Sequence, residues 1–360
     1  MLQHIRFFII EDGGNPRFES DIQQQDNGFW IHPFCEDESG FYRFRLNVRI
    51  ENDSTQTISV PVTIEWGDQQ GQEYRRFVLL SQGDEEWRIF QAEIEGTEAK
   101  AVVEAPPGTS YLSMHPRYEY GRYLQYLEGL DQNRFEIKVL GKSRRGREIH
   151  AIEAGNKAAP PLAVLTRVHP YETIGSYMVE GMLEWLKVEN EEVRQFLANN
   201  RLLFIPMPNP DGVADGNCKF THSSFNFSTT GRITKEPEGV AVREYLLSEK
   251  AVSLVDLHGW MLYHDNICTN DTQRGRKLYA MLSQHDNLFN KGIEMLYKKY
   301  PWVGRENNLG GMLVDEFDSV YYNTSWCWYD RSADDVQQMG VHIMRSYSQL
   351  FDSRVRGGSE

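Results

Sequence analysis

The chain has 360 residues, of which 40% are hydrophobic and 25% are charged, the composition of an ordinary soluble globular protein. Its formal net charge of −14 argues against nucleic acid as a partner, because a phosphate backbone requires a basic protein face. The four cysteines stand singly along the chain, so the sequence indicates neither a structural zinc cluster nor a disulfide framework.

The length favours two domains, at about 150 residues per domain. The apolar run near the N-terminus is interrupted at once by Glu11 and Asp12, and it is too short for a signal segment. No stretch approaches the ~20 apolar residues of a membrane helix. We therefore expect a cytoplasmic protein with no membrane partner.

The first third of the chain has the sequence pattern of strands separated by turns. Side chains alternate with period two over residues 41–50, as in a half-buried strand. Further predicted strands follow at 59–68, 75–80 and 99–105. Short strands at this spacing predict an all-β sandwich domain over residues 1–115, with a boundary near the Pro-rich steps at 106–116.

From residue 116 onward the pattern changes to alternating helices and apolar strands. We expect a helix at 120–130, a hairpin at 135–155, and later helices at 173–187 and 333–351. Nearly continuous apolar runs predict buried strands at 161–169, 201–209, 252–259 and 310–317. Buried strands separated by helices indicate an α/β domain over residues 116–360, with a mixed, largely parallel sheet and helices on both faces.

Three potential metal ligands stand where predicted buried strands end. His169 and Glu172 follow the strand at 161–169, and His258 lies at the end of the strand at 252–259. Ends of strands in open α/β sheets are where sites are built, and a catalytic zinc takes three His or Glu ligands. We expect one Zn²⁺ per chain on these residues. Asp256 is expected either to point to the opposite side of its strand or to serve as an outer partner of the site.

Four short motifs occur in an order that resembles the M14 family of zinc metallocarboxypeptidases. They are VHPYE at 168–172, PMPNPDGVADGN at 206–217, EPEG at 236–239 and DLHG at 256–259. Within that family the chain looks most like the cytosolic carboxypeptidase branch, which also carries a β-sandwich in front of its catalytic domain. The resemblance implies that His169, Glu172 and His258 bind the zinc.

The resemblance also implies a glutamate general base that follows a late strand and precedes the last helix. Glu316, at the end of the predicted strand 310–317, occupies that place in the sequence. The family's Thr-x-Glu motif is absent around Glu316. Asp330 is the second candidate carboxylate.

The arginines with which the family holds the oxyanion and the substrate carboxylate are not conserved in this chain. Lys219 stands where the cytosolic branch has an arginine, and the family's Asn-Arg pair is Asn226-Phe227. We expect Lys219 and Asn226 to contribute to substrate binding, with Arg232 as a possible substitute from the following loop. A lysine supplies charge but not the planar fork that grips a carboxylate.

The sequence thus predicts a zinc-dependent metallocarboxypeptidase that hydrolyses a peptide or peptide-like amide bond. Water activated by the metal would attack the amide, with a glutamate accepting the proton. Two alternatives stay open. One is a hydrolase of unusual amides, such as cell-wall peptides or acyl-amino acids, and the other is a non-catalytic binding module that retains the fold.

Overall fold

The chain forms two compact units in the computed structural model. The first comprises Met1–Tyr126 together with two later segments, His169–Thr173 and Pro210–Phe225, and the second holds the rest. The structure describes residues 2–37, 40, 42–67, 76–83, 86–260, 264–289, 294–299 and 308–351. The predicted domain boundary at 115/116 stays a prediction. The first unit extends to Tyr126 and also takes in the two segments from later in the chain.

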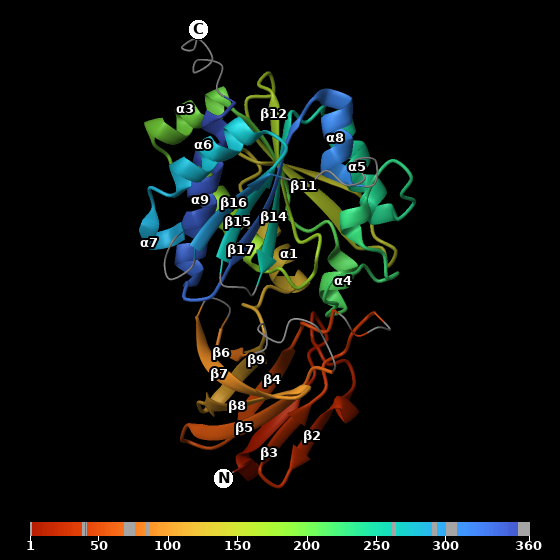
Figure 1. Ribbon diagram of the computed structural model, residues 1–360, viewed down its shortest axis with the longest axis vertical. Coiled ribbons are helices and arrows are strands. Elements are labelled where there is room, and N and C mark those ends of the chain that lie inside the picture. Colours follow the sequence, from red (N-terminus) through yellow and green to blue (C-terminus); the bar gives the residue numbers. More distant parts are fainter. Residues whose placement is uncertain are drawn as a thin grey trace. The chain divides into compact units, whose positions relative to one another are not determined.

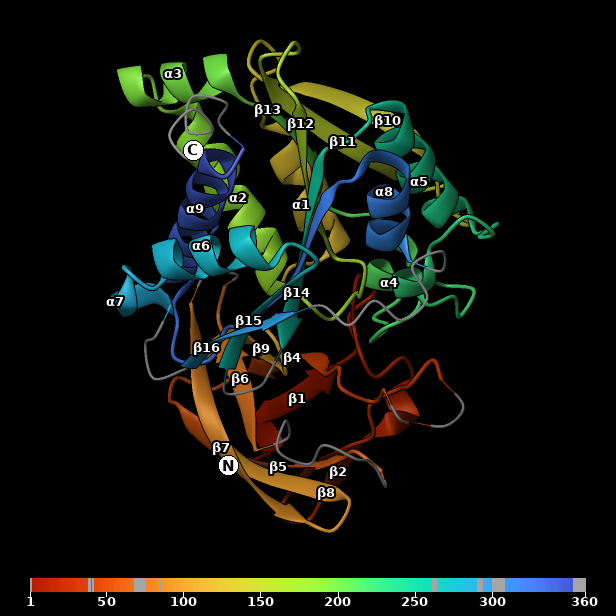
Figure 2. The ribbon, with the colours of Figure 1, turned by 45° about the horizontal axis from the view of Figure 1, so that its top comes forward.

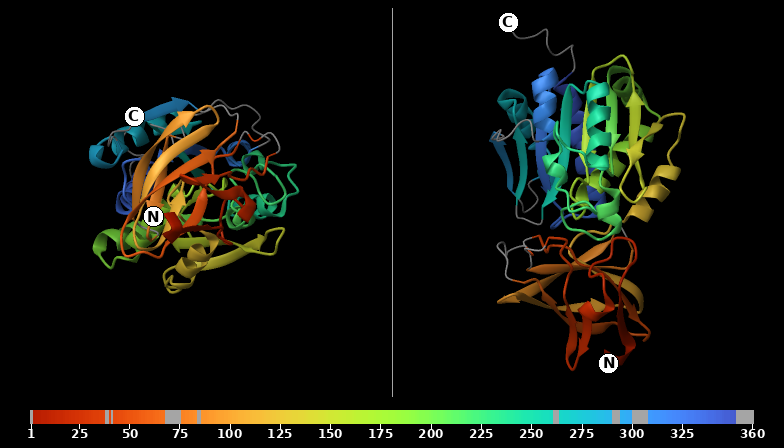
Figure 3. Two further views of the ribbon diagram at one scale, coloured as in Figure 1. Left: turned by 90° about the horizontal axis from the view of Figure 1, so that it is seen from below. Right: turned by 90° about the vertical axis from the view of Figure 1, so that its right-hand side faces the viewer.

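The first unit is built from strands that are mostly antiparallel, as expected for the predicted all-β domain. Its described strands are β1 (Ile5–Phe8), β2 (Ile22–Gln25), β3 (Gly28–Ile31), β4 (Asn47–Asn52), β5 (Ile58–Glu65), β6 (Phe77–Ser81), β7 (Trp87–Glu95), β8 (Glu98–Ala105) and β9 (Gly108–Ser113). They pair in the order β1-β4-β9-β6-β7-β8-β5-β3-β2, in which β3 and β5 run parallel. The long strands β7 and β8 are the orange hairpin seen from two further sides in Figure 3.

Strand β7 joins the two layers of this all-β fold. Its first half, through Gln91, pairs with β6, and its second half, from Ala92, pairs with β8. A strand that changes partners in this way forms the corner between packed sheets. In β5, every second side chain from Ile58 to Ile64 is buried, which is the period-two pattern of a half-buried strand.

One of the predicted strand ranges needs correction. Only the second half of 41–50 is a strand, because β4 begins at Asn47 and the residues described before it form a turn and irregular backbone. Asp68 and Arg75, at the ends of two predicted strands, lie outside the described residues.

The second unit contains a mixed sheet covered by helices. Its described strands are β10 (Glu136–Lys142), β11 (Glu148–Gly155), β12 (Pro161–Thr166), β13 (Arg201–Ile205), β14 (Ser253–Trp260), β15 (His264–Thr269), β16 (Glu294–Lys299) and β17 (Val320–Cys327). They pair in the order β10-β11-β13-β12-β14-β17-β15-β16. The central pairs β13–β12, β12–β14 and β14–β17 are parallel, which confirms the predicted sheet type.

Helices lie on both faces of this sheet, as predicted. The described helices are α1 (Tyr120–Glu128), α2 (Ile174–Lys187), α3 (Glu191–Asn199), α4 (Pro210–Ala214), α5 (Pro237–Ser248), α6 (Thr272–Leu282), α7 (Asp286–Phe289), α8 (Leu309–Phe317) and α9 (Ala333–Gln349). Helices α2, α6 and α9 cover one face, and α5 and α8 cover the other (Figures 1 and 2). None of the described helices combines the length and apolar composition that crossing a bilayer requires.

The strand predicted at 310–317 is wrong, because this segment is helix α8. The side chain of Asn308 caps the helix by accepting a hydrogen bond from the Gly311 amide, and Asp318 ends it in the left-handed conformation. Gly310 permits close packing, since a Cβ there would lie 2.4 Å from the Tyr321 ring. A short apolar run does not by itself distinguish a buried strand from a buried helix.

A fully buried ion pair fixes the chain after β17. The Arg331 guanidinium is 0% exposed and donates to both carboxylate oxygens of Asp265, at 3.0 and 2.6 Å. It also donates to the carbonyl oxygens of Leu288 and Cys327. Asp265 belongs to β15, so one side chain ties the end of β17 to the neighbouring strand.

We expect Asp265→Asn to lower the free energy of unfolding by about 3–5 kcal/mol, because it leaves a buried guanidinium without its counter-charge. Chemical denaturation followed by fluorescence measures the loss. The matched control is Glu184→Gln, which breaks an exposed pair with Lys187 and should cost at most about 1 kcal/mol. Equal losses in the two variants would contradict a special role for the buried pair.

Candidate metal centre

The first two predicted ligands lie in the tight turn between β12 and α2. The turn begins at Arg167, whose φ of 59° is left-handed, and the Glu172 amide donates to the His169 carbonyl at 3.2 Å. This places both side chains on one side of the turn, with His169 Nδ1 2.9 Å from Glu172 Oε1. The exposed fractions are 8% for His169 and 2% for Glu172, so an imidazole and a carboxylate meet in a buried position.

The third predicted ligand, His258, lies near the carboxyl end of β14 and is 6% exposed. Its Nε2 is 3.2 Å from Asp256 Oδ2, and the same oxygen accepts a hydrogen bond from the Tyr321 hydroxyl at 3.0 Å. The expectation that Asp256 points to the opposite side is therefore wrong, because residues two apart in a strand share a face. Asp256 instead contacts the imidazole, as an outer partner that orients a metal-binding histidine does.

The structure brings the three predicted ligands together. One donor atom from each of His169, Glu172 and His258 lies within 4.8 Å of the others. Two imidazoles and a carboxylate are the donor set of catalytic zinc sites, which keep a fourth position for water. Burying a carboxylate is costly without compensating positive charge, and a divalent cation here would supply it. The residues present therefore fit a zinc ion.

Within the first unit, the turn that carries His169 and Glu172 is held by contacts from distant parts of the chain. Arg45, which is 4% exposed, donates from Nη1 to the Pro170 carbonyl at 3.1 Å. The Tyr171 amide donates to the Cys218 carbonyl at 3.1 Å. The Tyr171 ring stacks on the His169 ring, with centroids 6.3 Å apart, and meets His115 edge-on at 5.1 Å.

The two residues predicted to bind substrate have other contacts in the structure. The Lys219 ammonium lies 4.2 Å from the centre of the Tyr42 ring, a cation–π contact. Asn226 caps the short helix Phe227–Thr229 by accepting a hydrogen bond from the Ser228 amide. Both side chains are half-buried, and their roles toward substrate stay predictions.

The predicted general base, Glu316, lies at the other end of the sheet. It sits on α8 just before β17, whose first residue, Val320, pairs with Ser253 at the start of β14. His258 pairs with Ser325, five residues further along β17. At about 3.3 Å per residue, that separation is about 17 Å. The Glu316 carboxylate forms an ion pair with Arg232 instead, so the geometry does not favour it as the base.

Asp330 lies at the end of the sheet where His258 is found. It follows β17, which contains no acidic residue, by three positions and is exposed. Its left-handed φ of 58° is stabilised by the neighbouring Arg331, whose buried hydrogen bonds fix the turn. The sequence offered Asp330 only as a second choice, because the position of β17 was missed.

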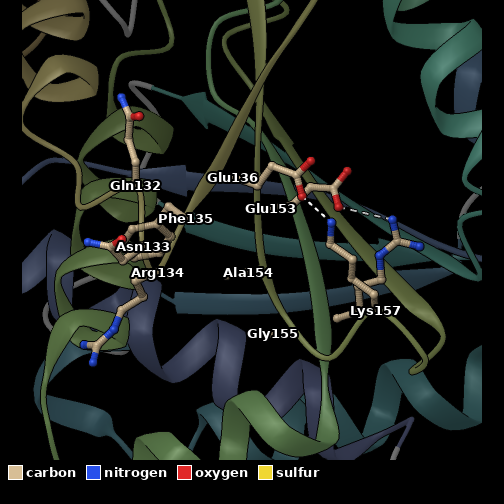
Figure 4. Close-up of a pocket in the computed structure, with 10 residues that line it drawn as sticks. Gln132, Asn133, Arg134, Phe135, Glu136, Glu153, Ala154, Gly155 and Lys157 are labelled. Carbon is tan, nitrogen blue, oxygen red and sulfur yellow. Dashed lines mark hydrogen bonds and ion pairs between the residues drawn. The ribbon is translucent and has the colours of Figure 1, made fainter.

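The cavity drawn in Figure 4 has a volume of about 210 Å³ and lies elsewhere in the second unit. Its lining includes Arg201, which pairs with the first residue of β12, whereas His169 follows the last residue. The charged side chains neutralise one another, because Glu136 pairs with Lys157 at 2.5 Å and Glu153 with Arg201 at 3.2 Å. This hollow therefore offers no group for metal chemistry.

Comparison with known proteins relates this chain to carboxypeptidases. Residues 120–220 match the zinc carboxypeptidase family, Peptidase_M14. This part of the chain is therefore similar to zinc carboxypeptidases. Carboxypeptidase M of Mus musculus is 24% identical over 54% of this chain and 49% of its own length. Cytosolic carboxypeptidase 2 of Danio rerio is 31% identical over 30% of this chain and 17% of its own length. The chain thus spans about half or less of these two relatives.

Solved metallocarboxypeptidase structures share the fold over nearly the whole chain. A metallo-carboxypeptidase from Burkholderia cenocepacia superposes with a TM-score of 0.83 at 15% identity, covering 97% of this chain and 100% of that one. An enzyme from Pseudomonas aeruginosa, solved with (2-guanidinoethylmercapto)succinic acid, gives 0.78 at 16% identity, with coverages of 96% and 99%. The carboxypeptidase-like fold predicted from the sequence is confirmed, including the β part in front.

We expect the purified protein to contain close to one zinc per chain, because three ligands and one open position define a single catalytic site. His169→Ala and His258→Ala should each abolish stoichiometric binding, while His4→Ala, a change at an exposed histidine, should not. Elemental analysis after zinc-supplemented expression is the measurement. Metal removal should also lower the melting temperature, since the ion binds only the native state. Metal-free wild-type protein would defeat the assignment.

Proposed function

We propose that the protein is a zinc-dependent metallocarboxypeptidase that hydrolyses a peptide or peptide-like amide bond, with one zinc per chain. The observation that carries the proposal is the buried group of His169, Glu172 and His258, in which Asp256 orients the last ligand. The match of residues 120–220 to the zinc carboxypeptidase family supports it. A cytoplasmic location stays a prediction.

The three ligands and their partners have different roles in the proposed hydrolysis. Zinc at this position would polarise the scissile carbonyl and lower the pKa of water. Glu172 and the two histidines hold the ion, and Asp256 keeps the His258 ring in one orientation. Lys219 supplies positive charge toward the developing oxyanion once its ammonium leaves the Tyr42 ring.

The proton of the attacking water needs an acceptor on the side of the sheet where His258 lies. Between the two carboxylates that the sequence offers, the strand register favours Asp330 over the predicted Glu316. The buried pair between Arg331 and Asp265 limits the freedom of the turn that carries Asp330, which suits a group that must meet substrate in one position.

We expect Asp330→Asn to reduce kcat by on the order of 10²–10⁴-fold at unchanged zinc content, because an amide cannot accept the proton. Glu316→Gln is the matched variant, and its effect should be small, since Glu316 lies at the far end of β17. Turnover and zinc content are measured on both. The reverse ranking would restore Glu316 as the base, and full activity in both variants would exclude both residues.

The specificity of the site differs from that of an ordinary carboxypeptidase in this proposal. Phe227 stands where the family has an arginine, and it is buried in the apolar core with 2% exposure. The Asn226 side chain caps the short helix Phe227–Thr229, where its oxygen accepts a hydrogen bond from the Ser228 amide. An apolar core side chain cannot grip a carboxylate, and this observation favours the second candidate function, hydrolysis of unusual amides.

Simple peptides with a free C-terminal carboxylate should therefore be poor substrates, because no arginine fork stands at that position. The test is a panel of ordinary peptides, peptides with acidic C-termini, cell-wall peptides and acyl-amino acids, each assayed for kcat/KM. Fast and unselective release of C-terminal residues would contradict the altered specificity. Zinc binding without turnover of any member would favour a non-catalytic binding module.

A further inference from the structure

The loop that presents Lys219 is closed around a carboxylate from another part of the first unit. The Cys218 amide donates to Glu36 Oε2 at 3.0 Å. The amides of Lys219 and Phe220 both donate to Glu36 Oε1, at 2.5 and 2.9 Å. Three successive amides directed at one anion form a concave anion-binding arrangement, and here the chain's own Glu36 fills it.

The same loop is hydrogen-bonded to the turn that carries two metal ligands. The Cys218 carbonyl accepts the amide of Tyr171, which lies between His169 and Glu172. The Cys218 amide is thus bonded to Glu36, and the Cys218 carbonyl is bonded to the turn that carries His169 and Glu172. Two hydrogen bonds in series connect the Glu36 carboxylate to the backbone of the metal-binding turn.

Two contacts that do not involve Glu36 hold the preceding stretch of this loop. The Gly13 amide donates to the Ala214 carbonyl at 2.8 Å, and the Asn15 side chain donates to the Gly216 carbonyl at 3.1 Å. Gly216 packs so closely that a Cβ there would lie 1.9 Å from the Gly14 carbonyl oxygen. Removal of Glu36 should therefore release residues 218–220 without detaching the loop as a whole.

We propose that Glu36 is a positioning residue for the hydrolysis, acting through the backbone of residues 218–220 on Lys219 and on the metal-binding turn. The inference rests on the proposed function of the site. Amide bonds to a charged acceptor are the stronger kind, so three of them set the direction of the Lys219 backbone. The Tyr42 ring adds to this by contacting both the Lys219 ammonium and, edge-on at 5.3 Å, the Phe220 ring.

The test compares Glu36→Gln, Glu36→Ala and Glu36→Asp with the control Glu19→Gln, which removes an exposed carboxylate from the same unit. Zinc affinity is measured by competition with a chromophoric chelator. The ligand geometry is measured by the visible spectrum of the cobalt-substituted protein. Steady-state assays give kcat and KM separately on the substrate that the panel identifies as best.

We expect Glu36→Ala to weaken zinc binding by roughly tenfold, as outer partners of metal sites do, and to alter the cobalt spectrum. It should lower kcat with KM nearly unchanged, because Lys219 acts on the transition state. Glu36→Gln should lie between Ala and wild type, since it retains one acceptor oxygen but turns an NH₂ group toward the other amides. Glu36→Asp should restore part of the loss by keeping the charge.

The outcomes separate this inference from the function it rests on. A wild-type protein that neither binds zinc nor turns over any substrate defeats the proposed function. A wild type that does both, with Glu36 variants equal to Glu19→Gln in affinity, spectrum and kcat, overturns the role of Glu36. If Glu36→Ala does not fold, Glu36→Gln decides, and loss of native circular dichroism in parallel with activity in that variant also overturns it.

Discussion

The parallel pairing of β12 with β14 is the constraint on which the site depends. The register sets Thr166, the last residue of β12, beside Leu257, and the Thr166 hydroxyl donates to the Leu257 carbonyl at 3.0 Å. Both strands therefore end at the same edge of the sheet, where His258 already lies on β14. A Cβ on Gly175 would come within 1.8 Å of the Thr166 hydroxyl oxygen, so α2 can start only with glycine at this point. The short turn between β12 and α2 carries His169 and Glu172.

The candidate metal ligands could be brought together from the sequence because each follows a local signal. An apolar run that ends in a histidine marks the end of a buried strand, and the motif order then supplied the family. The placement of Glu316 could not be predicted in the same way, since 310–317 is as apolar as a strand but is capped as a helix by Asn308. Missing that cap also hid β17, whose aromatic and polar residues lack the continuous apolar run of the other central strands.

Contacts between distant segments had no signal in the sequence. Glu36 is 182 positions before Cys218, and Arg45 is 125 positions before Pro170. Neither residue belongs to a motif, and each lies in the part of the chain predicted as a separate sandwich. Their contacts explain why the segments 169–173 and 210–225 belong to the first unit. Burial lowers the pKa of Arg45, and a guanidinium in such a position is retained only where its hydrogen bonds are satisfied. The β-rich part is thus bonded to the loops of the site rather than merely joined to them in sequence.

The residues that face the metal and those that would face a substrate follow different constraints. A zinc ion accepts few donor sets, and the candidate ligands His169, Glu172 and His258 form one of them. A substrate carboxylate constrains only the group that grips it, and where the family that this chain resembles has an arginine, this chain has Phe227 in its apolar core. Tyr171, between the two ligands of the turn, is likewise a large ring packed on His169 and His115. In the proposed function, a chain with the first set and a changed second set would retain the reaction class while its substrate differs, because catalysis by the metal and recognition of the leaving group reside in separate residues.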